Sequence, residues 1–243
     1  MILKNKNIIV TGGASGIGRE LVIFLCKKQN NVIFIDKDKN CANNLLNSLK
    51  SYSSYFFECD ISDDKNLKQT ISNITNKFKK IDILINNAGF QNIGEFATTE
   101  FKSVLQTNLI GTMQITQNFL PFMNNNSSIL NVLSVHAFIP RCNKIAYDVS
   151  KAGLLMFTKE LALEVADQNI TVNSISIGAC KTPMNNEWLN DKQKVQKVTQ
   201  KIPMKKIPQA KEVAKNIINI LQNFSDKTTG SNFVIDQGRS LKG

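Results

Sequence analysis

The sequence predicts an α/β fold, a single doubly wound parallel sheet of about seven strands with helices on both faces. Two observations carry this prediction. Short apolar runs rich in β-branched residues alternate along the whole chain with longer amphipathic stretches of helical spacing. No Pro- or Gly-rich linker, internal repeat or low-complexity tract interrupts this alternation, so residues 1–243 are expected to form one domain.

The seven apolar runs are the predicted strands. They span residues 7–11, 31–36, 55–59, 82–86, 128–134, 171–177 and 233–236. The amphipathic stretches between them are the predicted helices, at residues 16–29, 67–78, 101–123, 146–165 and 212–221. Strands that alternate with helices pair in parallel through right-handed crossovers. A ligand is therefore expected beyond the carboxyl ends of the strands, where the strand order reverses.

Composition narrows the class of protein. Of the 243 residues 42% are apolar, which is enough for a full core. No apolar stretch approaches the roughly 18 residues of a transmembrane helix, and none resembles a signal-peptide core, so a cytoplasmic protein is expected. Five scattered cysteines and a single histidine, His136, predict neither disulfides nor a metal site. Each cysteine is expected to be a small buried hydrophobe.

The net charge of +11 raises the question of a nucleic-acid partner. The cations are 27 lysines and only 3 arginines, beside 30 asparagines. Because readers of phosphate and bases rely on arginine forks, codon bias explains the lysine and asparagine excess better. We therefore expect no nucleic-acid partner and no membrane partner. A non-catalytic dinucleotide sensor or a nucleic-acid-associated protein stays open as the alternative class.

A glycine-rich turn, Thr11 to Gly18, joins the first predicted strand to the first predicted helix. Glycines let the backbone approach a pyrophosphate closely, and the amides at a helix N-terminus bind its charge. The turn with this strand and helix around it predicts a dinucleotide site. Its expected contacts are Gly12, Ser15, Gly16, Ile17 and Gly18.

Asp36 ends the second predicted strand and is expected to select the cofactor. A carboxylate at this place accepts hydrogen bonds from the adenosine ribose and repels a 2′-phosphate. Lys37 and Lys39 lie close by, but no arginine is there to clamp such a phosphate. The sequence therefore favours NAD over NADP.

Tyr147 and Lys151 form the predicted chemical centre. They lie four residues apart on a predicted helix and so share one face. The ammonium group, together with an oxidised nicotinamide, is expected to lower the tyrosine pKa from about 10 towards about 7. Such a tyrosine suits general acid/base catalysis of alcohol oxidation or ketone reduction. Ser134, at the end of the fifth predicted strand, is placed to hydrogen-bond the reacting oxygen.

Together these motifs resemble the short-chain dehydrogenase/reductase family, from about residue 4 to residue 238. The other matching elements are Asp60, Asn86-Asn87-Ala88-Gly89 and Asn108. The resemblance implies a Rossmann-type fold and an NAD(P)-linked oxidoreductase that acts on CH–OH groups. It implies a catalytic tetrad of Asn108, Ser134, Tyr147 and Lys151, with Asn108 supporting a water relay. It also implies cofactor contacts at Asp60, Ile61, Asn87, Ala88, Gly89, Tyr147, Lys151, Gly178 and Thr182.

The same resemblance implies a homotetramer joined through the helices at 101–123 and 146–165. Two positions depart from the family pattern. Ile177 stands where the family usually has proline, and Gln237 stands where it usually has glycine. Both positions shape loops, so the departures leave open the path of the substrate loop and the packing of the C-terminal segment.

Two sets of loop residues point to different substrates. Ser134-Val135-His136 and Ile202-Pro203-Met204 are similar to elements of bacterial glucose 1-dehydrogenases. Gln91, His136 and Lys144 are similar to the residues that hold a carboxylate in 3-hydroxybutyrate dehydrogenases. The substrate is thus expected to be a small polar alcohol, a sugar or a hydroxy acid. A 3-oxoacyl-[acyl-carrier-protein] reductase remains an alternative, which Asp36 fits poorly because reductive biosynthesis normally uses NADPH.

Residues 185–210 are the predicted lid over the substrate, since they are polar, rich in lysine and without a strand pattern. Trp188 is expected either to form a wall of the pocket or to pack the lid onto the core. Residues 181–215 contain nine lysines against three acidic residues. This local excess could draw an anionic substrate or an acidic carrier towards the site.

Overall fold

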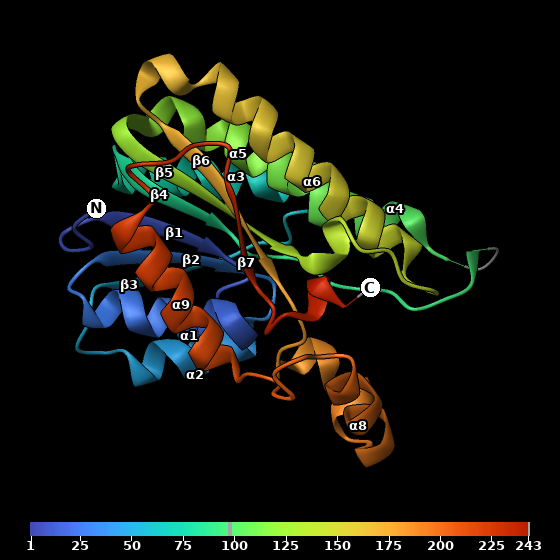
Figure 1. The fold of residues 1–243 in the computed structure, drawn as a ribbon. Helices are drawn as coiled ribbons and strands as arrows, with labels where there is room; N and C mark the ends of the chain where they lie inside the picture. Colours follow the sequence, from blue (N-terminus) through green and yellow to red (C-terminus); the bar gives the residue numbers. More distant parts are fainter. Residues whose placement is uncertain (97–98, 243) are drawn as a thin grey trace.

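A computed structural model of the chain describes residues 1–96 and 99–242. Its seven strands form one parallel sheet in the order β3-β2-β1-β4-β5-β6-β7, which confirms the predicted fold class (Figure 1). The strands are β1 (Asn7–Thr11), β2 (Asn31–Asp36), β3 (Ser54–Glu58), β4 (Ile81–Asn86), β5 (Met123–Ser134), β6 (Thr171–Ile177) and β7 (Asn232–Ile235). The order reverses between β1 and β4, so a crevice opens beyond their carboxyl ends.

Nine α-helices are found in the described residues, with several short helical turns. The helices are α1 (Gly16–Lys27), α2 (Lys39–Ser48), α3 (Asp64–Lys77), α4 (Phe101–Leu105), α5 (Thr112–Phe119), α6 (Ile145–Glu164), α7 (Asn186–Leu189), α8 (Lys192–Gln200) and α9 (Ala210–Asn223). The turns used below are the π-turn η2 (Gln106–Gly111) and the 3-10 turns η4 (Val135–Ala137), η6 (Pro183–Asn185) and η7 (Arg239–Leu241).

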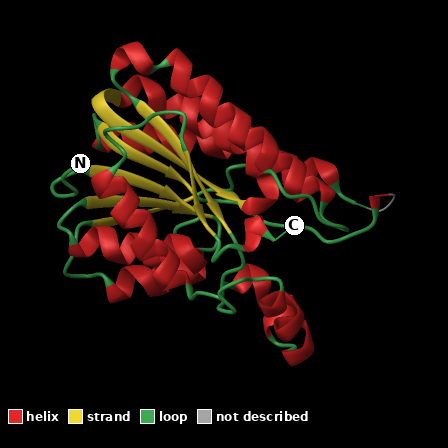
Figure 2. Ribbon diagram, viewed as in Figure 1, coloured by secondary structure: helices red, strands yellow, loops and turns green. Residues whose placement is uncertain are grey.

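The sheet lies between two layers of helices (Figure 2). On one face α1, α2 and α9 pack against alternate strand residues around Phe34 and Ile83. On the other face α3, α5 and α6 pack against the intervening strand residues around Ile33 and Leu84. Both faces of each central strand are therefore buried, as expected for the continuous apolar runs in the sequence.

Several elements differ from the sequence prediction. Helix α2 was not predicted, because only Ala42 and Leu45 of its ten residues are buried and the pattern is too polar to show an apolar face. Helices α7 and α8 form within the predicted lid, with no buried residue in either. The predicted helix at 101–123 is interrupted by the π-turn η2 before α5 begins.

The cysteine prediction is wrong at two positions. Cys26, Cys59 and Cys180 are buried, and burial raises the pKa of the Cys26 and Cys180 thiols to about 12. Cys41 and Cys142 are exposed free thiols instead. Cys41 lies on the solvent side of the polar helix α2, which explains why the sequence pattern did not place it.

The two departures from the family pattern are accommodated locally. Ile177 is buried at the end of β6, and the Gly178 amide donates to the Ile235 carbonyl at 2.9 Å. Gln237 adopts a left-handed φ of 55°, the conformation for which glycine is better suited. Within the described residues no helix combines the length and apolar character needed to cross a bilayer.

Candidate active site

A cavity of about 570 Å³ runs along the carboxyl ends of the strands. The loops that follow β1 to β6 line it, and so do the lid and the C-terminal turn η7. The position agrees with the prediction from the sheet topology. In Figure 1 the lid helix α8 stands out from the body of the molecule beyond this edge of the sheet.

The glycine turn forms one wall of the cavity. Gly12 has a φ of 64°, and a side chain there would press its Cβ to 2.8 Å from the Ala88 Cα. Gly16 also has a positive φ, of 54°. Gly18 does not line the cavity; it packs beneath the turn, where a Cβ would lie only 2.0 Å from the Gly12 carbonyl oxygen. Close contacts leave no room for a side chain at Gly12 or Gly18, and the positive φ of Gly12 and Gly16 favours glycine.

The N-terminus of helix α1 is open to an anion. Ser15 occupies its N-cap position without a side-chain hydrogen bond to the helix, and its first turn holds no acidic residue. By contrast, α2, α3 and α8 each begin at an aspartate whose carboxylate accepts from the first amides. The free amides of α1, beside the glycines and facing the cavity, fit a pyrophosphate group.

Asp36 lies at the same end of the cavity and is held by the backbone. Its Oδ2 accepts from the Ala14 amide at 2.9 Å, and its Oδ1 accepts from the Asp38 amide at 3.0 Å. Lys37 pairs with Asp60 at 3.5 Å, and Lys39 lies 2.9 Å from Glu58. Lys37 and Lys39 are therefore each paired with a carboxylate other than that of Asp36.

Asp60 and Ile61 follow β3 and line the cavity with Asp36. Burial raises the pKa of Asp60, but hydrogen bonds from Ser62 and the nearby Lys37 outweigh it and hold the pKa below its ordinary value. The Asp60 Oδ1 accepts from both the amide and the hydroxyl of Ser62. The carboxylate is thus ionised and fixed at neutral pH.

The loop after β4 is bonded to the glycine turn. The Thr11 hydroxyl accepts from the amides of Asn87 and Ala88, each at 3.0 Å. The Asn87 Nδ2 donates to the carbonyls of Thr11 and Gly12, also at 3.0 Å. Asn87, Ala88 and Gly89 all line the cavity, as predicted. The bonds make the two loops one rigid wall.

Ser134, Tyr147 and Lys151 meet at the other end of the cavity. Ser134 ends β5, while Tyr147 and Lys151 lie one turn apart on α6. All three residues are buried yet line the cavity. The Ser134 hydroxyl is hydrogen-bonded to Tyr147, and the Lys151 Nζ donates to the Val132 carbonyl at 2.9 Å. A hydroxyl, a phenol and an amine therefore converge on one place.

In the protein without cofactor, the pKa of Tyr147 lies above its ordinary value. Burial raises this pKa, and the charge of Arg141 and the bond with Ser134 only partly oppose this. Burial also lowers the pKa of Lys151, to about 8. The lysine Nζ lies 5.7 Å from the centre of the tyrosine ring. Lysine alone therefore does not produce a phenolate.

Asn108 is buried behind the cavity and does not line it. Its Oδ1 accepts from the Phe90 amide at 2.9 Å, and its Nδ2 donates to the Phe90 carbonyl at 2.8 Å and to the Ser150 hydroxyl at 3.1 Å. Ser150 in turn donates to the Tyr147 carbonyl at 2.6 Å. The side chain thus joins the β4 loop to the turn of α6 that carries Tyr147.

The predicted substrate residues separate into two groups. His136 lines the cavity, and its Nδ1 lies 2.8 Å from the Ile139 carbonyl, so this nitrogen carries the proton. Burial, with the charges of Arg141, Arg239 and Lys144, lowers the pKa of His136 to about 4. The imidazole is therefore neutral at physiological pH.

Gln91, Lys144 and Trp188 belong to the second group, a hydrogen-bonded network at the lid. The Lys144 Nζ donates to the Gln91 Oε1 at 2.7 Å. The Gln91 Nε2 donates to the Met184 carbonyl and the Asn185 Oδ1, and the Trp188 indole donates to the same Oδ1 at 3.1 Å. Gln91 and Trp188 line the cavity, whereas Lys144 does not.

Arg141, Asn185 and Arg239 are among the cavity residues that sequence reasoning missed. Asn185 also donates to the Cys180 carbonyl and so orders the start of the lid. The chain has only three arginines, and two of them line this cavity. The scarcity of arginine in the sequence is the signal that could have drawn attention to Arg141 and Arg239.

Gly178 and Thr182 line the cavity, as do the other predicted cofactor residues except Gly18. The parts of the cavity suit a dinucleotide: an open helix N-terminus for the diphosphate, a carboxylate for a ribose, and a phenol and amine at the far end. Such a set can position a hydride carrier and move a proton at a substrate hydroxyl.

Comparisons with known proteins give matches along nearly the whole chain. A family model described as enoyl-(acyl carrier protein) reductase matches residues 12–240. Glucose 1-dehydrogenase 2 of Bacillus subtilis (strain 168) is 30% identical, over 98% of this chain and 96% of that protein. The 3-oxoacyl-[acyl-carrier-protein] reductase FabG of Thermotoga maritima is also 30% identical, over 98% and 99%.

Solved structures agree with these matches. A 4-hydroxyisoleucine dehydrogenase complexed with NADH superposes with a TM-score of 0.90 at 26% identity, covering 98% of this chain and 100% of that chain. The matched region contains every cavity residue described above.

Proposed function

Because the chain belongs to the short-chain dehydrogenase/reductase family, we propose that it is an NAD(H)-dependent oxidoreductase for a small polar secondary alcohol and its ketone. Membership of the family makes it an oxidoreductase that acts on CH–OH groups. The non-catalytic sensor is therefore not retained. The observation that carries the proposal is the meeting of Ser134, Tyr147 and Lys151 in the cavity that the glycine turn and Asp36 also line.

Each residue of this group has a distinct part in the reaction. The nicotinamide, when bound, accepts the hydride in oxidation and supplies it in reduction. The Tyr147 Oη takes the hydroxyl proton in oxidation and returns it in reduction. Ser134 donates a hydrogen bond to the substrate oxygen and so fixes its distance from the phenol. Asn108 acts as a positioning residue, through Ser150 and the Tyr147 carbonyl.

Lys151 contributes charge and orientation. Its ammonium group lies on the same face of α6 as the phenol and donates to the Val132 carbonyl. Because burial raises the Tyr147 pKa in the free protein, the positive charges of Lys151, Arg141 and an oxidised nicotinamide must act together to make the phenol a base near neutral pH. The free protein is therefore expected to be a poor proton acceptor at Tyr147.

Three observations support NAD over NADP. Asp36 is fixed at the adenosine end with both oxygens turned to backbone amides of the surrounding loops. Lys37 and Lys39 are paired with other carboxylates. No arginine lines that end of the cavity among the described residues. A 2′-phosphate would meet a carboxylate with no dedicated cation to offset the repulsion.

The test is an assay of the purified protein with NAD and panels of sugars, polyols and hydroxy acids. Tyr147→Phe keeps the ring but removes the proton donor, so kcat is expected to fall by at least about a thousandfold. Tyr52→Phe, at an exposed tyrosine outside the cavity, is the matched control and should retain full activity. Turnover that survives Tyr147→Phe, or no turnover of any alcohol or ketone, contradicts the proposal.

A 3-oxoacyl-[acyl-carrier-protein] reductase is the second candidate. The 30% identity to the Thermotoga maritima enzyme and the nine lysines between residues 181 and 215 favour it. Reduction of a 3-oxoacyl thioester with NADH and NADPH separates the candidates. A thioester reduced with a far higher kcat/KM than free alcohols and ketones, and inhibition of that reaction by salt, support this candidate over the first.

We also propose that the protein assembles as a homotetramer through its α5 and α6 helices. Their outward residues include exposed apolar side chains, namely Met113, Val149, Met156 and Leu163. A second copy would cover these side chains. Light scattering of the full chain measures the mass, and a monomer at micromolar concentration contradicts this assembly.

A further inference from the structure

The cavity separates its charges along its length. Its acidic lining residues, among those described, are Asp36, Asp38 and Asp60, all at the adenosine end. The opposite end, where Ser134 and Tyr147 lie, is lined by cations without an acid. These cations are Arg141, Lys151, Lys201 and Arg239.

Arg239 lies at the start of η7, and its Nη1 is buried without a hydrogen-bond partner. The nearest acid on its own segment, Asp236, is already used, because its two oxygens accept from the amides of Gly238 at 2.9 Å and Ser240 at 2.6 Å. A buried guanidinium nitrogen without an acceptor is costly, so a ligand oxygen at this point would stabilise the site.

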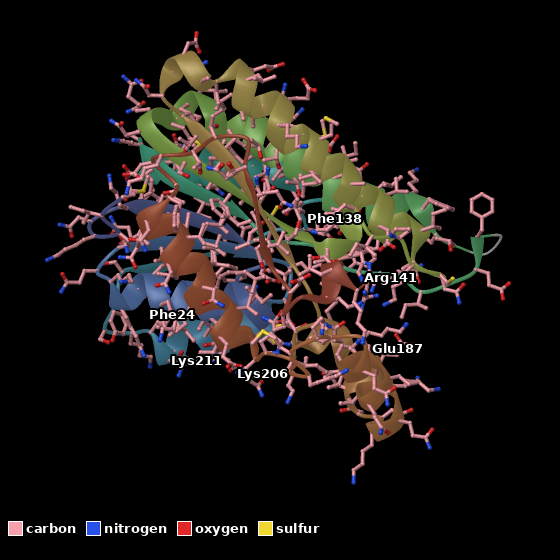
Figure 3. All side chains as sticks on the ribbon, in the orientation of Figure 1. Phe24, Phe138, Arg141, Glu187, Lys206 and Lys211 are labelled. Atoms are coloured by element: carbon pink, nitrogen blue, oxygen red, sulfur yellow. The ribbon has the colours of Figure 1, made fainter. Side chains whose placement is uncertain are left out.

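Arg141 lies close to the reacting group. Its guanidinium carbon is 5.3 Å from the centre of the Tyr147 ring, and its Nε donates to Asp148 at 3.2 Å. Asp148 therefore fixes the guanidinium through one edge, while the terminal Nη groups are not used in that contact. Both Arg141 and Arg239 act electrostatically on His136, so they lie around the same part of the cavity. Figure 3 labels Arg141, and Glu187 of the lid helix α7.

The residues first expected to hold a carboxylate are engaged elsewhere. Lys144 does not line the cavity, and its ammonium group donates to Gln91. The Gln91 amide nitrogen donates to the lid. His136 is neutral and hydrogen-bonded to its own loop. Lys201 also lines this end but is exposed to solvent, so apart from Lys151 the two arginines are the less exposed cations there with donors left for a ligand.

We propose that Arg239 and Arg141 bind an anionic group of the substrate, so that the protein acts on a small hydroxy acid or oxo acid, or on an alcohol that carries a phosphate. The inference rests on the proposed function. Guanidinium groups bind carboxylate and phosphate in a forked geometry. The anion also offsets the positive charge that Lys151 and an oxidised nicotinamide bring to the same end of the cavity.

The experiment compares matched substrates that differ only in charge. Wild-type protein is assayed with NAD on short 2-, 3- and 4-hydroxy acids, on their methyl esters, and on hydroxyalkyl phosphates of the same length. For at least one chain length we expect kcat/KM to be tenfold or more higher for the acid or the phosphate than for the ester. Whichever anion is preferred identifies the natural group.

Variants then assign the preference to Arg239. Arg239→Gln is expected to raise the KM for the preferred anion ten- to a hundredfold and to change the KM for the ester by no more than about twofold. Arg239→Lys should recover part of the lost affinity for the anion. Arg19→Gln removes the third arginine, a partly exposed residue that pairs with Glu20 outside the cavity. This variant should change neither the KM for the anion nor the KM for the ester. Circular dichroism confirms that each variant is folded.

Two results overturn the inference while the proposed function stands. One is equal use of acids, phosphates and esters, or turnover confined to sugars. The other is a loss in Arg239→Gln that is the same for charged and neutral substrates. If no alcohol of any kind is oxidised, the proposed function fails as well, so the two failures are distinguishable.

Discussion

At the scale of single residues, Lys151 is buried where the proposed reaction needs it, and its burial lowers the stability of the folded protein. Its ammonium group is buried, and its pKa is lowered to about 8. In the unfolded chain the pKa is about 10.5, so the unfolded state binds more protons between about pH 8 and pH 10.5. Burial of this ammonium group therefore lowers the free energy of unfolding by its full amount below about pH 8. The loss is recovered as the pH rises from about 8 to about 10.5.

We expect Lys151→Met to stabilise the protein while abolishing its activity. Lowering the Lys151 pKa from 10.5 to about 8 corresponds to about 3 kcal/mol at pH 7, and loss of the bond to Val132 offsets about 1 kcal/mol. The free energy of unfolding should thus rise by about 2 kcal/mol at pH 7, and the gain should shrink towards pH 10. Urea titrations without cofactor at pH 7 and pH 10 measure it. Lys159→Met, at an exposed lysine of the same helix, is the control, and an equal effect there would refute the account.

Asp36 gives a second prediction at this scale, for the cofactor. Asp36→Asn removes the charge that we propose to face the adenosine ribose and leaves the side-chain size unchanged. At about 5 Å and an effective dielectric of 20, the removed repulsion is about 3 kcal/mol. The ratio of kcat/KM for NAD to that for NADP should therefore fall by about a hundredfold. Asp167→Asn, in the exposed turn before β6, should leave the ratio unchanged, and an unchanged ratio in Asp36→Asn contradicts the assignment.

The sequence could reveal the residues that motifs carry, and the structure places Ser134, Tyr147, Lys151 and Asp36 in one cavity. The scarcity of arginine could have drawn attention to Arg141 and Arg239, but the sequence could not place them in this cavity. These side chains come from a loop and from the C-terminal turn, about a hundred residues apart, and no spacing rule predicts that two irregular segments meet. Asn108 was placed in a helix, but its contacts with Phe90 depend on a π-turn that periodicity does not show.

At the scale of elements, helices α3 and α8 form a natural comparison. Each begins at an aspartate that accepts from two amides at 2.9–3.1 Å, Asp63 for α3 and Asp191 for α8. Helix α3 buries Leu67, Ile71 and Ile74, whereas α8 has no buried residue. The cap of α3 therefore supports the whole fold, and the cap of α8 supports only the lid.

Replacing each cap by alanine should cost about 1 kcal/mol locally. Asp63→Ala is expected to lower Tm by about 2–4 °C, because α3 is part of the cooperative core. Asp191→Ala should leave Tm unchanged but speed hydrogen exchange of the α8 amides about fivefold. Calorimetry and hydrogen exchange give the two readouts. Equal shifts of Tm in both variants would show that the lid unfolds together with the core.

Buried strands were the most predictable elements. The bounds of β1 and β2 agree with the apolar runs at 7–11 and 31–36, because a strand buried on both faces is a largely continuous apolar run. The bounds of β6 also agree with the prediction at 171–177, although β6 buries the polar residues Asn173, Ser174 and Ser176. Helices α2 and α8 were not predictable in this way. They depend on Asp38 and Asp191 caps and on sparse contacts, and few residues of these Asn- and Lys-rich segments are large and apolar.

At the scale of the whole molecule, the two helical layers share one sheet and should unfold together. Ile217 of α9 is fully buried on one face, and Ile115 of α5 is fully buried on the other. Replacing either by valine removes one methylene and should cost about 1 kcal/mol. The sequence could predict the layers but not the strand order, since alternation alone does not say which strands are neighbours.

We expect Ile115→Val and Ile217→Val to lower a single unfolding transition by about the same amount, some 2–4 °C each. Calorimetric and van't Hoff enthalpies of the wild type should agree, as for one cooperative unit. Two transitions, of which each variant moves only one, would show that the faces of the sheet unfold independently and would contradict the prediction of a single domain.

The turn η6 has a consequence for the order of events during turnover. Gly16 lies against Thr182 and Pro183, where a Cβ would be 3.6 Å and 3.8 Å from their side chains, while Asn185 is bonded to Gln91. The segment therefore passes from the β1 loop to the β4 loop across the middle of the cavity. We expect release of a dinucleotide from the cavity to require that the Gln91–Asn185 contact opens, and this release, rather than the proton transfer, to limit the rate.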